Sequence, residues 1–291
     1  MPGHNAIYLF LSLLLTACGP VVDTAQRVPG QDSLPEMDSG QRQRLSDTTF
    51  LANGRMVSIL ASKEEHKGTI LCLPGWSYSR LDVCEKSAFC EKALAQGYHL
   101  VLPEMEKSIY ASQPYPETRK DWLGFPQLPF ITDTLIPHLQ RELGLLLYGQ
   151  NNFLYGISTG GRGVALIAIH TDTLFRAGAA LSGDFNQLLD PGDNLMKGWY
   201  GEFEKFPERW KTDNPSMTPG KIMIPLFFAH GMADKVVPDK QTTAFEKLLR
   251  QTKASTTPDH VAIIKPDAGH DYEFWDSQTQ AVLKFFDANC R

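Results

Sequence analysis

Residues 153–161 read FLYGISTGG, an apolar run that leads into Ser158 with a glycine two positions to either side. The run predicts a strand buried on both faces, and the apolar residues from Val164 to Ile169 predict a helix soon after it. A strand that turns sharply into a helix presents one side chain at the edge of the sheet, and G-x-S-x-G is typical of such a turn. The flanking glycines allow neighbouring backbone to pack close to the turn. The stretch therefore predicts Ser158 as a nucleophile.

A serine hydroxyl is protonated at neutral pH, so it needs a base and a carboxylate that orients the base. The apolar run from Ile222 to Ala229 leads into a loop with Asp234, and the run from Val261 to Ile264 leads into a loop with His270. The order Ser, Asp, His, with each residue after a predicted strand, resembles the α/β-hydrolase superfamily. The resemblance implies that Ser158, Asp234 and His270 are the catalytic residues.

Other acidic residues compete with Asp234 for the third role. Asp267 and Asp271 lie too close to His270 in sequence for an obvious strand-end geometry, and Asp239 suits the start of the following helix. Asp184 follows another predicted strand and could line the pocket or replace Asp234 as the acid. We therefore prefer Asp234 and keep Asp184 as the alternative.

The alternation of strands and helices over residues 50–291 fits an α/β-hydrolase fold, a doubly wound, mostly parallel sheet with helices on both faces, in a single domain. The predicted strands are Arg55 to Leu60, Thr69 to Leu73, His99 to Leu102, Phe153 to Ile157, Ala177 to Leu181, Ile222 to Ala229 and Val261 to Ile264. The predicted helices are Ser87 to Ala95, Thr132 to Leu145, Gly161 to Ile169, Lys240 to Gln251 and Ser277 to Asp287.

The loop at residues 73–78, LPGWSY, follows one of the predicted strands. The resemblance implies that the backbone amide of Trp76 joins that of Thr159 in an oxyanion hole. The commoner His-Gly pair of the superfamily is Pro74 and Gly75 here.

Residues 182–222 occupy the position where many hydrolases insert a lid, and they are rich in aromatic residues. These aromatics either form an apolar wall of the pocket or only cover the sheet. The candidate substrate-binding residues are Tyr78, Asp184 and Trp199.

Three short stretches, at residues 200–210, 214–215 and 225–231, resemble the catalytic module of the prolyl oligopeptidase family, as does the doublet Gly160-Gly161. Members of that family usually carry a β-propeller that selects peptides, and we expect no such domain to fit in this chain. Stand-alone modules of similar pattern include carboxylesterases and dienelactone-hydrolase-like enzymes. We therefore expect a carboxylesterase-like serine hydrolase that cleaves small-molecule esters. The alternatives are a peptidase of short peptides and a non-catalytic binding lipoprotein that keeps the hydrolase fold.

The first residues resemble a bacterial lipoprotein signal peptide, with an apolar run from Ala6 to Leu15 before Leu-Thr-Ala and Cys18. The resemblance implies removal of residues 1–17, lipid modification of Cys18 and anchoring to a membrane. Residues 18–49 are polar and rich in Pro and Gly, which predicts a flexible tether before the catalytic domain at 50–291. The expected location is the cell envelope, and, because Gly19 follows the cysteine, the outer membrane facing the periplasm or the surface in a Gram-negative host.

The other cysteines are Cys72, Cys84, Cys90 and Cys290, an even number that permits disulfides in an oxidising compartment without fixing their pairing. The net charge of −5 and the lack of a basic block argue against nucleic-acid binding. The sequence has no metal-ligand spacing and no nucleotide-binding glycine motif, so we expect no metal and no cofactor. It does not predict an oligomeric state.

Overall fold

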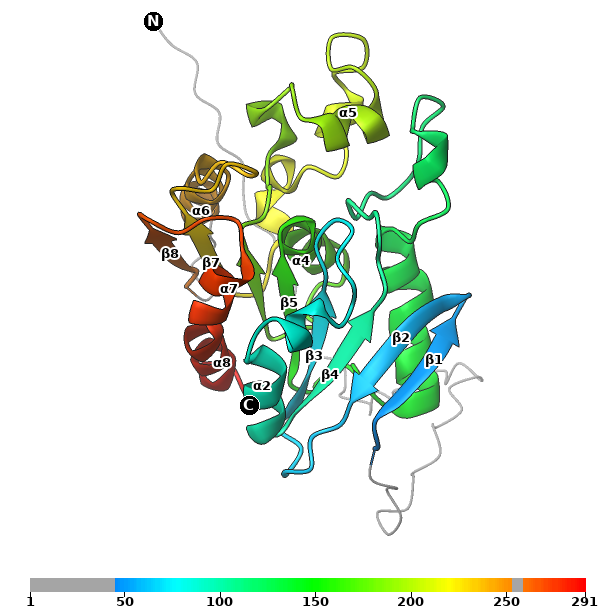
Figure 1. Cartoon of the computed structure of the whole chain (residues 1–291), viewed down its shortest axis with the longest axis vertical. Coiled ribbons are helices and arrows are strands. Elements are labelled where there is room, and N and C mark those ends of the chain that lie inside the picture. The colour runs from blue at the N-terminus through cyan, green and yellow to red at the C-terminus, as the bar shows by residue number, and fades with distance from the viewer. Residues whose placement is uncertain (1–44, 253–258) are drawn as a thin grey trace, which may run out of the picture. The chain divides into compact units, whose positions relative to one another are not determined.

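The apolar runs form the inner strands of an eight-stranded sheet in the computed structural model, which describes residues 45–252 and 259–291 (Figure 1). The strands are β1 (Thr48–Ala52), β2 (Arg55–Leu60), β3 (Gly68–Leu73), β4 (Tyr98–Pro103), β5 (Asn152–Ile157), β6 (Ala177–Leu181), β7 (Leu226–Gly231) and β8 (Val261–Lys265). Their spatial order is β1-β2-β4-β3-β5-β6-β7-β8. This confirms the predicted α/β-hydrolase fold.

The pairs β1–β2 and β2–β4 are antiparallel, and all later pairs are parallel. From β3 the chain first adds β4 on one side and then returns to add β5 on the other side. The strands β3 and β5 are therefore neighbours with a reversal of strand order between them, and Leu73 pairs with Gly156. Open parallel sheets bind ligands at such a switch point, beyond the carboxyl ends of the strands.

Helices cover both faces of the sheet (Figure 1). The α-helices are α1 (Asp82–Glu85), α2 (Phe89–Ala95), α3 (Ile136–His138), α4 (Thr159–His170), α5 (Asn194–Tyr200), α6 (Lys240–Thr252), α7 (Tyr272–Ser277) and α8 (Thr279–Ala288). Short 3-10 and π-helical turns are η1 (Lys120–Trp122), η2 (Phe130–Leu135), η3 (Leu139–Leu143), η4 (Gln187–Leu189), η5 (Arg209–Lys211), η6 (Pro215–Met217) and η7 (Pro219–Lys221). One face packs on α3, α4 and α6, and the other packs on α2, α7 and α8.

The residues of β3 show why the strands are apolar on both sides. Leu71 and Leu73 belong to the hydrophobic cluster on one face, and Ile70 and Cys72 belong to the cluster on the other. Because successive side chains of a strand point to opposite faces, a strand covered twice needs an unbroken apolar run.

The structure corrects several sequence-based boundaries. β1 was not predicted, and it places Thr48 and Thr49 in the sheet rather than in the tether. β7 begins at Leu226 rather than Ile222, because Pro225 and the turn η7 precede it. The helical segment predicted from Thr132 runs over residues 130–143 through η2, α3 and η3.

A third hydrophobic cluster lies outside the sheet. It joins Ile109 and Trp122, from the segment after β4, to Trp199, Tyr200 and Trp210. In Figure 1 the segment after β4 and α5 lie toward the end of the sheet where β4 terminates. The two segments together form a cap with its own core.

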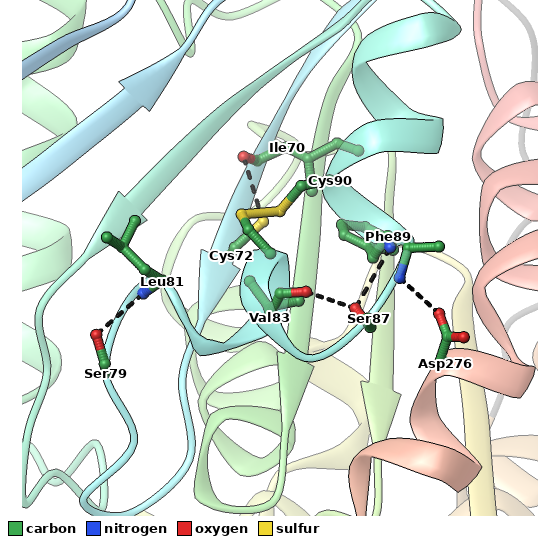
Figure 2. Close-up of a disulfide and its surroundings, with 11 residues drawn as sticks. Ile70, Cys72, Ser79, Leu81, Val83, Ser87, Phe89, Cys90 and Asp276 are labelled. Carbon is green, nitrogen blue, oxygen red and sulfur yellow. Dashed lines mark hydrogen bonds between the residues drawn. A yellow bond between two sulfur atoms is a disulfide. The ribbon is translucent and has the colours of Figure 1, made fainter.

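A disulfide joins Cys84 in α1 to Cys90 in α2, with the two Cα atoms 5.0 Å apart (Figure 2). The chain turns between the two short helices, and the Ala88 amide donates a hydrogen bond of 2.8 Å to Asp276 Oδ1. Cys72 and Cys290 are free thiols. The sequence left the pairing of the cysteines open. The bridge between Cys84 and Cys90 is possible because the chain turns between α1 and α2, since one continuous helix would hold the two cysteines too far apart.

The predicted signal peptide, Cys18 and nearly all of the tether lie outside the described residues. Within residues 45–252 and 259–291, no helix has the length and apolar character needed to cross a membrane.

Candidate active site

Ser158 lies at the turn between β5 and α4 with φ of 54° and ψ of −126°. A positive φ is strained for a residue with a side chain, and strain of this kind is concentrated at functional sites. The turn is possible because the residues two positions before and after Ser158 are glycines. A Cβ atom at Gly156 would overlap the Gly160 carbonyl, and one at Gly160 would overlap the Leu73 carbonyl. The G-x-S-x-G pattern therefore reflects close packing of backbone around Ser158.

The three predicted catalytic side chains meet at the carboxyl ends of the parallel strands. The Asp234 carboxylate accepts a hydrogen bond from His270 Nδ1, with 2.6 Å between Nδ1 and Oδ2. His270 Nε2 lies 2.9 Å from Ser158 Oγ. With Nδ1 donating to Asp234, Nε2 accepts a hydrogen bond from the Ser158 hydroxyl. β5, β7 and β8 lead into the loops that carry these residues. The sheet therefore brings together residues that are up to 112 positions apart.

Asp234 is buried, and its surroundings favour its charged form. Burial by itself raises the pKa of Asp234, but hydrogen bonds from His230, His270 and the Val237 amide outweigh burial and hold the pKa well below its usual range. An ionised carboxylate beside an imidazole fixes the tautomer of the ring and stabilises the imidazolium.

His230 is fully buried at the end of β7. Its Nδ1 lies 2.7 Å from Thr242 Oγ1, and its Nε2 lies 2.9 Å from the Val237 carbonyl. Because a carbonyl only accepts, Nε2 carries the proton, and Nδ1 accepts from the threonine hydroxyl. His230 is thus a packed, hydrogen-bonded histidine.

The ring of His270 is held by Trp275, which the sequence-based assignment did not single out. The two ring centroids are 5.1 Å apart in an edge-to-face arrangement. The Trp275 indole N–H donates a hydrogen bond of 3.0 Å to Ser182 Oγ. Trp275 belongs to α7, a short helix capped by Asp271, whose carboxylate accepts from the Phe274 amide. Asp271 therefore caps a helix instead of orienting His270.

Thr159 follows Ser158 in the chain, and the pairing of β3 with β5 brings the loop that contains Gly75 and Trp76 toward Ser158. A Cβ atom at Gly75 would lie 3.0 Å from Ser158 Cβ. The loop that contains Gly75 is held by a 2.8 Å hydrogen bond from Tyr110 Oη to the Pro74 carbonyl. Within the described part of the chain, the amides of Trp76 and Thr159 donate no hydrogen bond. The role of these two amides in an oxyanion hole stays a prediction.

A cleft opens beside Ser158. Its lining residues come from four segments and are Ser158, Thr159, Asp184, Gln187, Asp190, Asp193, Leu195, Met196, Val236, Val237, Pro238 and Gln241. Of the three residues predicted to bind substrate, only Asp184 lines this cleft. Trp199 is 2% exposed and packs in the cap cluster, with its indole N–H donating to the Gln113 carbonyl. Tyr78 packs against Tyr272 and Trp275.

Arg162 organises the wall of the cleft from inside α4. Its guanidinium is fully buried and pairs with the Asp184 carboxylate at 3.2 Å. Its other hydrogen-bond acceptors are the Ile109 carbonyl, Gln187 Oε1, Tyr200 Oη and the Asp213 carbonyl. The sequence signal for this role is one arginine among the glycine and apolar residues at positions 160–169. Asp184 is therefore an ion-pair partner of Arg162 and does not contact His270.

No group of three or more His, Cys, Asp or Glu side chains that could hold a metal ion occurs among the residues that the structure describes.

A serine on a strained strand-to-helix turn, with a histidine at hydrogen-bond distance and free amides beside it, defines a serine hydrolase of the α/β-hydrolase fold. Solved structures share this fold. A fluorophosphonate-binding serine hydrolase of Staphylococcus aureus matches with a TM-score of 0.64 and 16% identity, over 83% of this chain and 97% of the other. An S-formylglutathione hydrolase of Agrobacterium tumefaciens matches with a TM-score of 0.61 and 14% identity, over 85% of this chain and 100% of the other.

The acylaminoacyl peptidase of Pyrococcus horikoshii matches with a TM-score of 0.63 and 16% identity, over 84% of this chain and 41% of the other. Identities this low establish the fold alone. No curated protein sequence matches the chain. Residues 142–290 match the model of the prolyl oligopeptidase family. The chain belongs to that family and is a hydrolase.

Proposed function

We propose that this protein hydrolyses carboxylic esters through an acyl-serine intermediate. The observation that carries the proposal is the continuous hydrogen-bonded series from Asp234 through His270 to Ser158, at 2.6 and 2.9 Å. In this mechanism His270 Nε2 takes the Ser158 proton while Oγ attacks the ester carbonyl. Asp234 orients the ring and stabilises the imidazolium, and the amides of Trp76 and Thr159 stabilise the oxyanion.

The first tetrahedral intermediate collapses as His270 Nε2–H protonates the departing alcohol, leaving an acyl-Ser158 ester. Water then attacks this ester with His270 as the base, and the acid product leaves. Ester cleavage is supported by a structural neighbour named a ferulic acid esterase, of which the chain covers 96%. The family match supports a second candidate, a peptidase of short peptides, which would use the same residues on an amide.

Labelling with a fluorophosphonate, followed by peptide mapping, tests the proposal. We expect stoichiometric labelling at Ser158 that is lost in Ser158→Ala and in His270→Ala. A folded protein that remains unlabelled would instead indicate a binding module. Matched p-nitrophenyl esters and p-nitroanilides then separate the two enzyme candidates, since a higher kcat/KM on the anilides would favour the peptidase.

We also propose that the protein is anchored in the cell envelope by lipid on Cys18, on the outer membrane of a Gram-negative host. Support comes from the sequence of the first residues alone. In such a host, radiolabelled palmitate should enter the full chain and not Cys18→Ser. Equal labelling of both chains would disprove the anchor.

A further inference from the structure

The cleft beside Ser158 is lined by apolar residues and by a group of acidic residues, which we call its acidic side. Val236, Val237 and Pro238 come from the loop after β7, and Leu195 and Met196 come from α5. The acidic side carries three carboxylates, from Asp184, Asp190 and Asp193.

Only one of the three carboxylates is neutralised by a partner. Asp184 pairs with Arg162 at 3.2 Å. Within residues 45–252 and 259–291, Asp190 and Asp193 form no ion pair, and their side chains accept only from the amides of Gly192 and Met196. Lys240 Nζ lies nearby but reaches the Leu189 carbonyl, at 3.4 Å. The cleft thus has an excess of negative charge beside the nucleophile.

The carboxylates lie close enough to affect one another. Burial raises the pKa of Asp184, the Arg162 charge lowers it and the negative charge of Asp193 raises it, and together these effects bring the pKa to about 6. A cation placed among these groups would relieve the repulsion between Asp184 and Asp193.

The hydroxyl group of Thr159 is a further polar group in the cleft. Thr159 lines the cleft and is 4% exposed, and its hydroxyl oxygen has no hydrogen-bond partner among the described residues. A buried polar oxygen without a partner is costly, so a ligand that supplies an N–H donor would stabilise it. Ammonium and guanidinium groups donate N–H and carry positive charge.

We propose that the substrate carries a positively charged amino or guanidinium group, which the acidic side of the cleft binds while Ser158 attacks the neighbouring carbonyl. This inference rests on the proposed function, because it assigns the substrate class of the same site. The aliphatic stem of such a group packs along Val236, Val237 and Met196 while its charge faces Asp190 and Asp193.

The test compares esters that differ only in charge. The p-nitrophenyl esters of Nα-blocked lysine, Nε-acetyl-lysine and norleucine place the charge, or its neutral counterparts, on the acyl side. A choline ester and its 3,3-dimethylbutyl isostere place it on the leaving group. For at least one side, we expect kcat/KM to be about 10- to 100-fold higher for the charged ester, which is the range for a hydrogen bond to a charged group.

The double variant Asp190→Asn/Asp193→Asn should reduce the ratio of kcat/KM for charged and neutral esters by about tenfold or more. Asparagine at 193 can still cap α5, so the fold of the cleft is retained. The control Asp133→Asn/Asp172→Asn changes the net charge equally at exposed positions outside the cleft, and it should keep the ratio of the unaltered protein.

The outcomes separate the two proposals. Failure of Ser158 to react with a fluorophosphonate would overturn the proposed function itself. If Ser158 reacts and the neutral esters are hydrolysed, but neither charged ester is preferred, the proposed function stands and the charge inference is overturned. A preference that survives in the double variant would likewise overturn it.

Discussion

His230 Nε2 lies 3.3 Å from Asp234 Oδ2, the same oxygen that His270 Nδ1 reaches at 2.6 Å. His230 is itself held by Thr242 and by the Val237 carbonyl. Two histidines therefore fix one carboxylate oxygen, and only one of them contacts Ser158. This arrangement predicts that His230 positions Asp234.

Replacing His230 with Phe should lower kcat about tenfold and leave KM nearly unchanged, because the aspartate loses an orienting donor that never contacts substrate. The measurement is steady-state kinetics on one neutral ester. His230→Gln, which keeps a donor, should recover part of the loss. A change in KM alone, with kcat intact, would contradict this role.

Asp234→Asn should reduce kcat by about 10,000-fold with the fold preserved, because an amide cannot stabilise the imidazolium and favours the wrong tautomer. The matched control is Asp184→Asn, which removes the other acid that the sequence offered. If Asp184→Asn caused the greater loss of kcat, our assignment of the acid would have to be reversed.

Asp184 should give stability a pH dependence of recognisable sign. Its pKa in the folded protein, about 6, is above the ordinary 3.8, because burial outweighs the attraction of Arg162. The folded state therefore holds more protons than the unfolded state between pH 4 and 6, and this contribution to the free energy of unfolding falls as the pH rises through that window.

Urea unfolding of the natural protein and Asp184→Asn at pH 4, 5, 6 and 7 checks this prediction. From pH 4 to 6, the variant should gain on the order of 1 to 2 kcal/mol relative to the natural protein, and the difference should become constant above about pH 7. A gain by the natural protein over the same window would contradict the sign.

The disulfide between Cys84 and Cys90, six positions apart, should contribute about 2 kcal/mol to the free energy of unfolding, as expected for a short closed loop. Urea unfolding of the natural protein with and without dithiothreitol measures it. Cys84→Ser/Cys90→Ser should match the reduced protein and show no response to the reductant. An equal response of both proteins would assign the effect to something other than this bond.

Much of the fold could be predicted because inner parallel strands are covered on both faces and so appear as unbroken apolar runs. β2 and β6 match their predicted limits. The edge strand β1 was missed because most of its residues are exposed, so it lacks such a run. α7 was missed because it is a short helix whose buried residues, Phe274 and Trp275, are too few to show a period.

The positions of Ser158, Asp234 and His270 could be predicted from order alone, since each residue follows a strand and parallel strands end at one edge. The pocket was less predictable. Trp199 was predicted to bind substrate but is buried in the cap cluster with Trp122, which is far away in sequence. Burial by a distant segment leaves no local pattern.

The sequence by itself determined the order of strands and helices, the serine turn and the three loops that carry the candidate catalytic residues, because these depend on short-range periodicity and backbone chemistry. Only the tertiary structure decided which acid reaches His270, which cysteines pair and which side chains face the cleft. Those outcomes depend on distances between segments that are far apart along the chain, and such distances are set by how the helices and the cap pack on the sheet.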